Sequence, residues 1–191
     1  MLTARDNSIL DFVNINGGIT IKQCAKLFFA TCKMSEDLAR KRLKILAENK
    51  ELLYGDDWCT NQRIYYLKKK PCSHLVKLLD FYVELKINGA EIIEFEREPK
   101  FDKCRPDALI LFSYKDKGRI LFLEVDMSHK TNLNKYTELY NAEIMQREYN
   151  TFPLVVIMDN EPKQEPIKNK GFEVEYLNYK LEGFKEKILM N

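Results

Sequence analysis

The chain has 191 residues, of which 45% are hydrophobic and 31% charged, so it can bury a core and lies outside the range of disordered sequences. No apolar run approaches the ~20 residues needed to cross a bilayer, and the N-terminus does not resemble a signal peptide. Its five cysteines form no CxxC pair, and it has two histidines. We therefore expect a cytoplasmic protein with reduced thiols, no zinc site and no membrane partner.

Charge is distributed unevenly along the chain. Residues 1–70 contain thirteen Lys/Arg and eight Asp/Glu, a net charge of +5, whereas residues 71–191 contain eighteen and twenty-one, a net charge of −3. Pro71 interrupts the chain directly after the run Lys68–Lys70. These features predict two domains, 1–70 and 71–191, of which the first meets a polyanion.

The first seventy residues predict three helices and a hairpin. Apolar periodicity indicates helices over 5–16, 21–28 and 36–49, with Thr3, Thr20 and Ser35 as their N-caps. Two β-prone runs, 52–54 and 63–67, flank a polar loop and predict a hairpin. Three helices followed by a hairpin are typical of a winged helix-turn-helix, and the alternative is a three-helix bundle without a role in DNA binding.

The third predicted helix carries a basic outer face. With Ala39, Leu43 and Leu46 buried, basic side chains point outward, as in a helix that enters the major groove of double-stranded DNA. An ordinary solvated face is the alternative. Because only Arg40 and Arg42 offer forked donors on this helix, we expect mainly phosphate contacts. The predicted DNA-binding residues are Lys33, Ser35, Arg40, Lys41, Lys44, Arg63, Lys68 and Lys69.

The remainder of the chain predicts an α/β domain with a crossover helix. The expected elements, in order, are a helix over 73–88, strands over 91–96, 107–114 and 119–126, a helix over 131–149, strands over 153–158 and 173–177, and a helix over 181–190. The polar segment 160–170 is expected to be a mobile loop.

Carboxylates gather where these strands begin and end. Asp107 opens one strand, and Glu124 and Asp126 project from the same face at the end of the next. Three converging carboxylates could hold Mg²⁺ or Mn²⁺, ions that stabilise the charge developed when a phosphodiester is cut. The alternative is an acidic rim on an ordinary sheet.

The spacing of Pro106-Asp107 and Glu124-Val125 resembles the PD-(D/E)xK nuclease motif. The resemblance implies a restriction-endonuclease-like α/β fold with Asp107 and Glu124 as metal ligands. Asp126 stands where the motif has lysine, and Lys130 or Lys135 could supply the missing cation. The candidate catalytic set is therefore Asp107, Glu124, Asp126 and Lys130. We favour a nuclease-like domain without activity, with an active metal nuclease and an unrelated α/β fold as alternatives.

The order of motifs is similar to that of the replication-relaxation family of plasmids, phages and integrative elements. The chain shows His74-Leu75, Arg105-Pro106-Asp107, Glu124-Val125-Asp126 and Lys135-Tyr136 with Tyr140, but departs from the family pattern at Met127-Ser128. The resemblance implies a DNA-binding accessory in plasmid replication, relaxation or mobilisation, with a relaxase or replication protein as partner and a homodimer left open. A DNA endonuclease and a transcriptional regulator remain the alternatives.

Three further side chains have two interpretations each. Trp58 in the predicted hairpin could stack against DNA, but we favour a hydrophobic anchor for the hairpin. Tyr136 and Tyr140, four residues apart on one helix, could suggest relaxase nucleophiles. Relaxases need a histidine cluster for their metal and His129 stands alone, so we favour packing or phosphate contact. Cys104 is expected to be inert.

Overall fold

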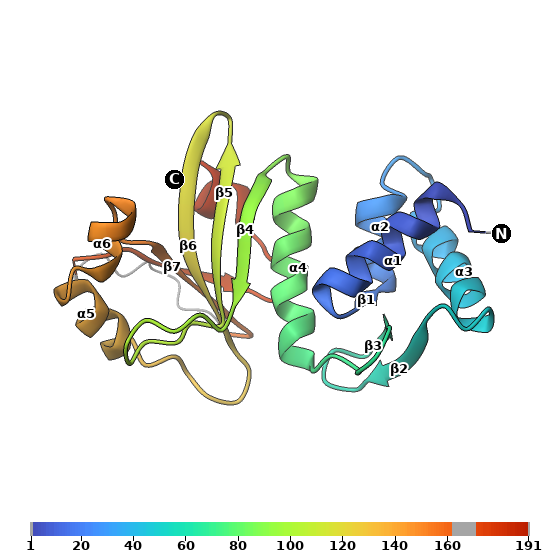
Figure 1. The fold of residues 1–191 in the computed structure, drawn as a ribbon, viewed down its shortest axis with the longest axis horizontal. Coiled ribbons are helices and arrows are strands. Elements are labelled where there is room, and N and C mark those ends of the chain that lie inside the picture. The colour runs from blue at the N-terminus through green and yellow to red at the C-terminus, as the bar shows by residue number, and fades with distance from the viewer. Residues whose placement is uncertain (1, 162–170, 191) are drawn as a thin grey trace. The chain divides into compact units, whose positions relative to one another are not determined.

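The computed structural model describes residues 2–161 and 171–190 and shows a mixed α/β protein with two separate sheets (Figure 1). The chain divides into two compact units, Met1–Ile87 and Asn88–Asn191. Each unit has its own sheet. No helix within these two ranges combines the length and the apolar character needed to cross a membrane.

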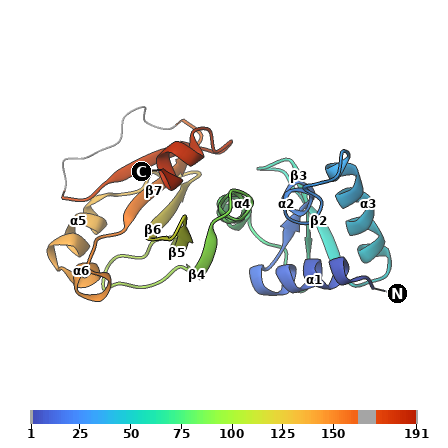
Figure 2. The ribbon, with the colours of Figure 1, turned by 90° about the horizontal axis from the view of Figure 1, so that it is seen from above.

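The N-terminal unit begins with three helices and a small antiparallel sheet. Its first elements are α1 (Ala4–Asn16), β1 (Ile19–Thr20), α2 (Ile21–Phe28), α3 (Ser35–Glu48), β2 (Leu53–Asp57) and β3 (Gln62–Tyr66). The strand order is β1-β3-β2, with Thr20 opposite Ile64 and Gly55 opposite the same residue on the other side. Figure 2 shows the three helices grouped around these short strands.

Two of the three predicted N-caps are confirmed. Thr3 and Thr20 each form a capping box, in which the side chain accepts a hydrogen bond from the backbone three residues on. The prediction for Ser35 is wrong: α3 starts at Ser35 itself, and its N-cap is Met34, which has no side-chain capping bond. Gly17 ends α1 with a φ of 90°, a left-handed conformation that glycine adopts without strain.

A buried ion pair joins α1 to α3 inside this unit. Asp6, with no exposed surface, accepts bidentate hydrogen bonds from the guanidinium of Arg42. Around the pair lies an apolar core to which α1, α2, α3 and the sheet all contribute, including Ile9, Leu43 and Leu46. The polar side of α3 is therefore not uniformly free for solvent, because Arg42 faces α1.

A fourth helix, α4 (Ser73–Ile87), belongs to the N-terminal unit. The side chain of Gln23 on α2 donates to the carbonyl of Val76 at 3.1 Å and to the carboxylate of Asp80 at 2.8 Å. Lys26 and Glu84 form an ion pair at 2.7 Å. The compact unit thus extends beyond Pro71, where charge and proline placed the predicted boundary, because polar contacts fix α4 to α2.

The C-terminal unit is a five-stranded mixed sheet with helices. Its elements are β4 (Glu91–Arg97), β5 (Ala108–Tyr114), β6 (Lys117–Asp126), α5 (Asn134–Asn141), α6 (Ile144–Tyr149), β7 (Leu154–Asp159), β8 (Val174–Asn178) and the short π-helix η1 (Lys185–Leu189). The strand order is β4-β5-β6-β7-β8; β4, β5 and β6 are antiparallel, and β6, β7 and β8 are parallel. The helices α5 and α6 lie together on one face of the sheet (Figures 1 and 2).

The predicted strands of this unit are found, but two predicted helices differ. The expected helix over 131–149 is broken into α5 and α6, because Glu143 between them adopts a left-handed φ of 57° that a continuous helix does not allow. The expected helix over 181–190 is reduced to η1. The predicted mobile loop lies mostly outside the described residues.

An aromatic cluster forms the core between the sheet and α5. Phe122 on β6 and Tyr136 on α5 are fully buried with ring centroids 5.3 Å apart. Phe152 and Phe172 extend the cluster towards β7 and β8. Because Phe122 and Glu124 share a face of β6, this packing also places Glu124 beneath α5.

Candidate nucleic-acid interface and carboxylate site

A hollow of about 650 Å³ lies between α3 and the β2–β3 hairpin of the N-terminal unit. Its cationic lining residues are Arg40 and Lys44 from α3 and Arg63 from β3. Arg40 and Lys44 point outward because Ala39, Leu43 and Leu46 take the opposite face of α3 into the core, where each is fully buried. The remaining lining residues are Ile21, Ala47, Glu48, Tyr54, Asp56 and Tyr65. This surface combines three cations with aromatic side chains.

Each of these three cations has an internal carboxylate partner. Arg40 pairs with Asp37 at 2.7 Å, and Lys44 with Glu48 at 3.7 Å. The guanidinium of Arg63 binds Asp56 through two hydrogen bonds, of 2.8 and 3.1 Å. These pairs are exposed, so each contributes little to stability.

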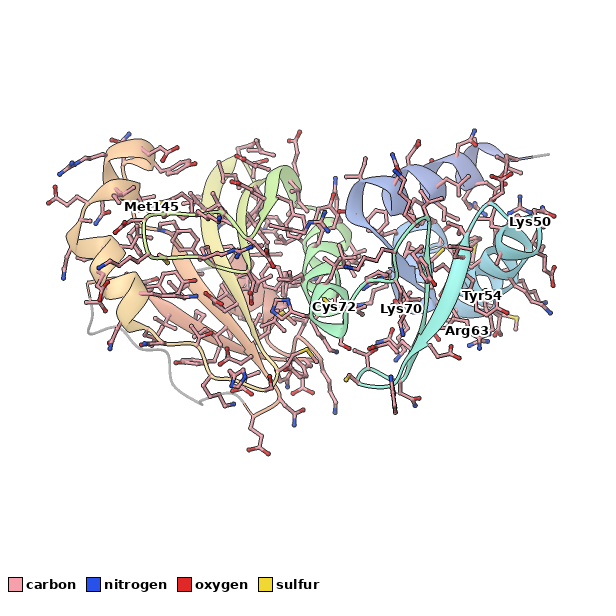
Figure 3. The ribbon with its side chains drawn as sticks, turned by 60° about the horizontal axis from the view of Figure 1, so that its bottom comes forward. Lys50, Tyr54, Arg63, Lys70, Cys72 and Met145 are labelled. Carbon is pink, nitrogen blue, oxygen red and sulfur yellow. The ribbon has the colours of Figure 1, made fainter. Side chains whose placement is uncertain are left out.

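The hairpin itself places a ring beside a cation. The guanidinium of Arg63 on β3 lies over the ring of Tyr54 on β2, at 5.1 Å from its centroid (Figure 3). The two side chains can meet because the pairs Tyr54–Tyr65 and Asp56–Arg63 are two register positions apart, so Tyr54 and Arg63 lie on the same face of the hairpin. The Asp56 carboxylate keeps a lowered pKa because it accepts hydrogen bonds from Arg63.

The other predicted DNA-binding residues do not line this hollow. Lys33, Lys41, Lys68 and Lys69 are exposed and form no ion pair with any residue in the described part of the chain. Ser35 is half-buried at the first position of α3. The suggestion that Arg42 offers a forked donor to DNA is wrong, because its guanidinium is taken by Asp6.

In the C-terminal unit, Asp107 and Glu124 lie near each other at one end of β5 and β6. The Asp107 side chain accepts a hydrogen bond from the backbone N–H of Val125 at 2.7 Å. Glu124 is 5% exposed, and its carboxylate receives the hydroxyl of Tyr136 and the Nζ atom of Lys135, the latter at 2.5 Å. Lys135 also donates to the backbone carbonyl of Arg105 at 3.1 Å, so α5 delivers its cation to this site.

Burial shifts the pKa values of Glu124 and of the side chains around it. Desolvation raises the pKa of Glu124 above its usual range; Lys135 and Tyr136 oppose the shift, and the charge of Asp107 adds to it. Burial, followed by the nearby Glu124 charge, raises the pKa of Tyr136 well above its ordinary value. Burial also raises the pKa of the Cys104 thiol to about 11, which agrees with the expected inert cysteine.

Asp126 and Lys130 belong to different contacts from those predicted. The Asp126 carboxylate accepts the backbone N–H of Thr131 at 3.0 Å and its hydroxyl at 2.5 Å. Lys130 forms its ion pair with Asp159 rather than with Glu124. The Asp126 side chain is therefore hydrogen-bonded to the segment that leads into α5, and the cation that pairs with Glu124 is Lys135.

The expected convergence of three carboxylates on one ion is not found. Over residues 2–161 and 171–190, no group of three or more His, Cys, Asp or Glu side chains is arranged to hold a metal. Asp107 and Glu124 are the two predicted ligands that the structure keeps near each other, and magnesium is commonly held by one or two carboxylates with water and phosphate completing its shell.

The prediction that Trp58 is a hydrophobic anchor for the hairpin is wrong. Trp58 lies in the turn after β2, and its side chain is 93% exposed, so it is no anchor for the hairpin. Alternation along the hairpin gave no signal for this position, because Trp58 falls in the turn rather than in a strand. For Tyr136, the expected packing role is confirmed by its complete burial.

Comparison of the chain with protein-family models, with curated proteins and with solved structures found no match in any of the three. The resemblance to the replication-relaxation family therefore stays a prediction, which depends on the motifs around Asp107, Glu124 and Lys135.

Proposed function

We propose that the N-terminal unit is a winged helix-turn-helix that binds double-stranded DNA. The observation that carries the proposal is the hollow in which Arg40 and Lys44 of α3 face Arg63 of the hairpin. The element order, with three helices, a short β1 and the β2–β3 hairpin paired in one sheet, supports the assignment of α3 as recognition helix and the hairpin as wing.

DNA phosphates would replace the internal carboxylates at this surface. Exposed ion pairs are worth about 0–1 kcal/mol each, so exchange of Asp37 and Asp56 for phosphate oxygens costs little. The exposed lysines Lys41, Lys68 and Lys69 pair with no carboxylate within residues 2–161 and 171–190, and they add contacts to the flanking DNA backbone. The resulting interface depends mainly on phosphates and is therefore sensitive to salt.

The test is DNA binding by the double variant R40A/K44A. Each lost phosphate contact lowers the salt slope, the steepness of log affinity against log salt, by about 0.9, so the double variant should bind more weakly with a slope reduced by about 1.8. The charge-matched control is K180A/K185A, which removes two exposed lysines of the C-terminal unit. Unchanged affinity and slope in R40A/K44A would refute this assignment.

The strand order of the C-terminal unit supports the resemblance to the replication-relaxation family. A β4-β5-β6 meander followed by a crossover through α5 to the parallel β7 is compatible with a PD-(D/E)xK-like fold. On this basis the protein is a DNA-binding accessory of plasmid or mobile-element replication, relaxation or mobilisation. A relaxase or replication protein is its proposed partner, and self-association into a homodimer is part of the same proposal.

A second candidate function is endonuclease activity, which Lys135 specifically favours. The resemblance assigns the motif lysine to the attacking water, and Lys135 Nζ lies 2.5 Å from the Glu124 carboxylate. Asp107 and Glu124 would hold Mg²⁺ or Mn²⁺, which supplies stabilisation of charge on the phosphodiester. Lys135 therefore offers from α5 the cation that Asp126 cannot provide.

Cleavage is tested with supercoiled plasmid in the presence of Mg²⁺ or Mn²⁺. Wild type should relax or linearise the plasmid, while D107N and K135M should not. K130M is the matched control, because Lys130 pairs with Asp159 and should leave cleavage intact. Plasmid that stays supercoiled with wild type would exclude this candidate and leave DNA binding by the N-terminal unit as the function.

A further inference from the structure

The turn between β2 and β3 presents an aromatic side chain to solvent. Trp58 is 93% exposed, the largest exposed fraction among the large hydrophobic side chains of the described residues. A tryptophan can bury roughly 150–250 Å² when a partner covers it. Since single exposed apolar residues are common on protein surfaces, the exposure matters only together with the surroundings of Trp58.

The backbone turn that carries Trp58 is held in place by hydrogen bonds. The residue before Trp58, Asp57, is buried, and its carboxylate accepts the N–H of Thr60 at 3.1 Å, the Thr60 hydroxyl at 2.5 Å and the Ser73 hydroxyl at 2.7 Å. These hydrogen bonds fix both ends of the turn and attach it to the start of α4. Trp58 is thus presented from a fixed turn, which reduces the entropy lost when a partner covers it.

A polar hollow lies beside the indole of Trp58. It measures about 390 Å³ and is lined by Asp56, Asp57, Trp58, Asn61, Gln62 and Arg63. The Gln62 Oε1 atom is buried without a hydrogen-bond partner among the described residues. Amide and guanidinium groups are the side chains that pair with the edges of nucleobases, and aromatic rings stack on their faces.

We propose that Trp58 is a stacking platform for an unpaired base of the DNA that the N-terminal unit binds. This inference rests on the proposed function. An intact duplex covers both faces of every internal base, so an indole can stack only where a base is bulged, flipped or next to a gap. The hollow at Asn61 and Gln62 then receives the edge of the stacked base. The unit consequently prefers duplexes that contain unpaired bases over perfect duplexes.

The chain is well suited to a direct test, because Trp58 is its single tryptophan. The full chain is titrated with a random-sequence duplex, either perfect or carrying a central three-nucleotide bulge. Anisotropy of labelled DNA measures binding, and tryptophan emission measures stacking. We expect strong quenching by the bulged duplex alone. W58A should bind the bulged duplex roughly 5- to 150-fold more weakly and the perfect duplex as wild type does; W58F should retain most of the preference.

Y114A is the matched control, since Tyr114 lies at the β5–β6 hairpin of the other unit and should not affect binding. If DNA binds but Trp58 emission is unchanged, or if W58A keeps wild-type affinity for the bulged duplex, the inference is overturned and the proposed function stands. Equal quenching by both duplexes overturns the preference for unpaired bases. Absence of binding to either duplex by a folded wild-type chain refutes the proposed function together with the inference.

Discussion

If Arg40 and Arg63 bind phosphates as proposed, removal of the carboxylates that pair with them should strengthen DNA binding. In the double variant D37N/D56N, Arg40 loses its partner at 2.7 Å and Arg63 loses a bidentate partner. Exposed pairs of this kind are weak, and this weak attraction is what a phosphate must replace. The two substitutions together should therefore tighten binding roughly 2- to 30-fold.

Fluorescence anisotropy with a labelled duplex over a series of salt concentrations measures this gain. The matched control is E138Q/E143Q, which removes two exposed carboxylates from α5 and the start of α6 and changes net charge equally. A gain confined to D37N/D56N supports local exchange of partners. An equal gain in both variants would show that only net charge matters, and no gain in D37N/D56N would refute phosphate binding by Arg40 and Arg63.

Three further predictions concern stability and reactivity. D6N should lower the free energy of unfolding by about 2–3 kcal/mol in urea titrations at pH 7, because Arg42 loses its buried partner. Arg42 holds the pKa of Asp6 well below its usual range, so wild type should lose this stability advantage over D6N as pH falls through that lowered pKa. An advantage that persists at pH 1 would contradict this explanation. The pKa of Glu124 is raised, so its contribution to stability is full below about pH 4 and is lost as pH rises through the folded pKa; the unfolding free energy of wild type relative to E124Q should decrease from pH 4 to 7. Burial raises the pKa of Cys24 to about 12 and that of Cys104 to about 11, so a thiol reagent at pH 8 should label exposed Cys59 and Cys72 first, as peptide mapping would show.

The sequence was sufficient for the elements whose signals are local. Thr3 and Thr20 begin helices through capping boxes that involve a residue three positions on, and the apolar run that ends at Met158 is a buried parallel strand. The break between α5 and α6 could not be predicted in the same way, because the left-handed conformation at Glu143 has no glycine to signal it. The attachment of α4 to α2 depends on Gln23 and Asp80, which are far apart in sequence.

In the candidate sites too, sequence patterns predicted local positions but not tertiary partners. Periodicity on α3 correctly placed Arg40 and Lys44 on the exposed face, yet it also offered Arg42, whose partner Asp6 lies on another helix. Spacing along β6 put Glu124 and Asp126 on one face, but it carried no information about Thr131, which takes the Asp126 carboxylate. Partner choice between charged groups depends on tertiary distances, and these distances decide which charges remain available.

The two candidate sites differ in what a polyanion must displace. In the N-terminal unit, the side chains of Arg40 and Asp37 are 55% and 46% exposed, so a phosphate can exchange for the carboxylate at a cost of about 0–1 kcal/mol. In the C-terminal unit, the side chains of Lys135 and Glu124 are 25% and 7% exposed, so loss of Lys135 would leave a buried carboxylate charge unpaired unless another cation takes its place. The proposed phosphate binding by α3 and the hairpin therefore needs no cofactor, whereas metal binding at Glu124 would require the cation to replace Lys135. This difference favours the proposed DNA binding over the proposed cleavage.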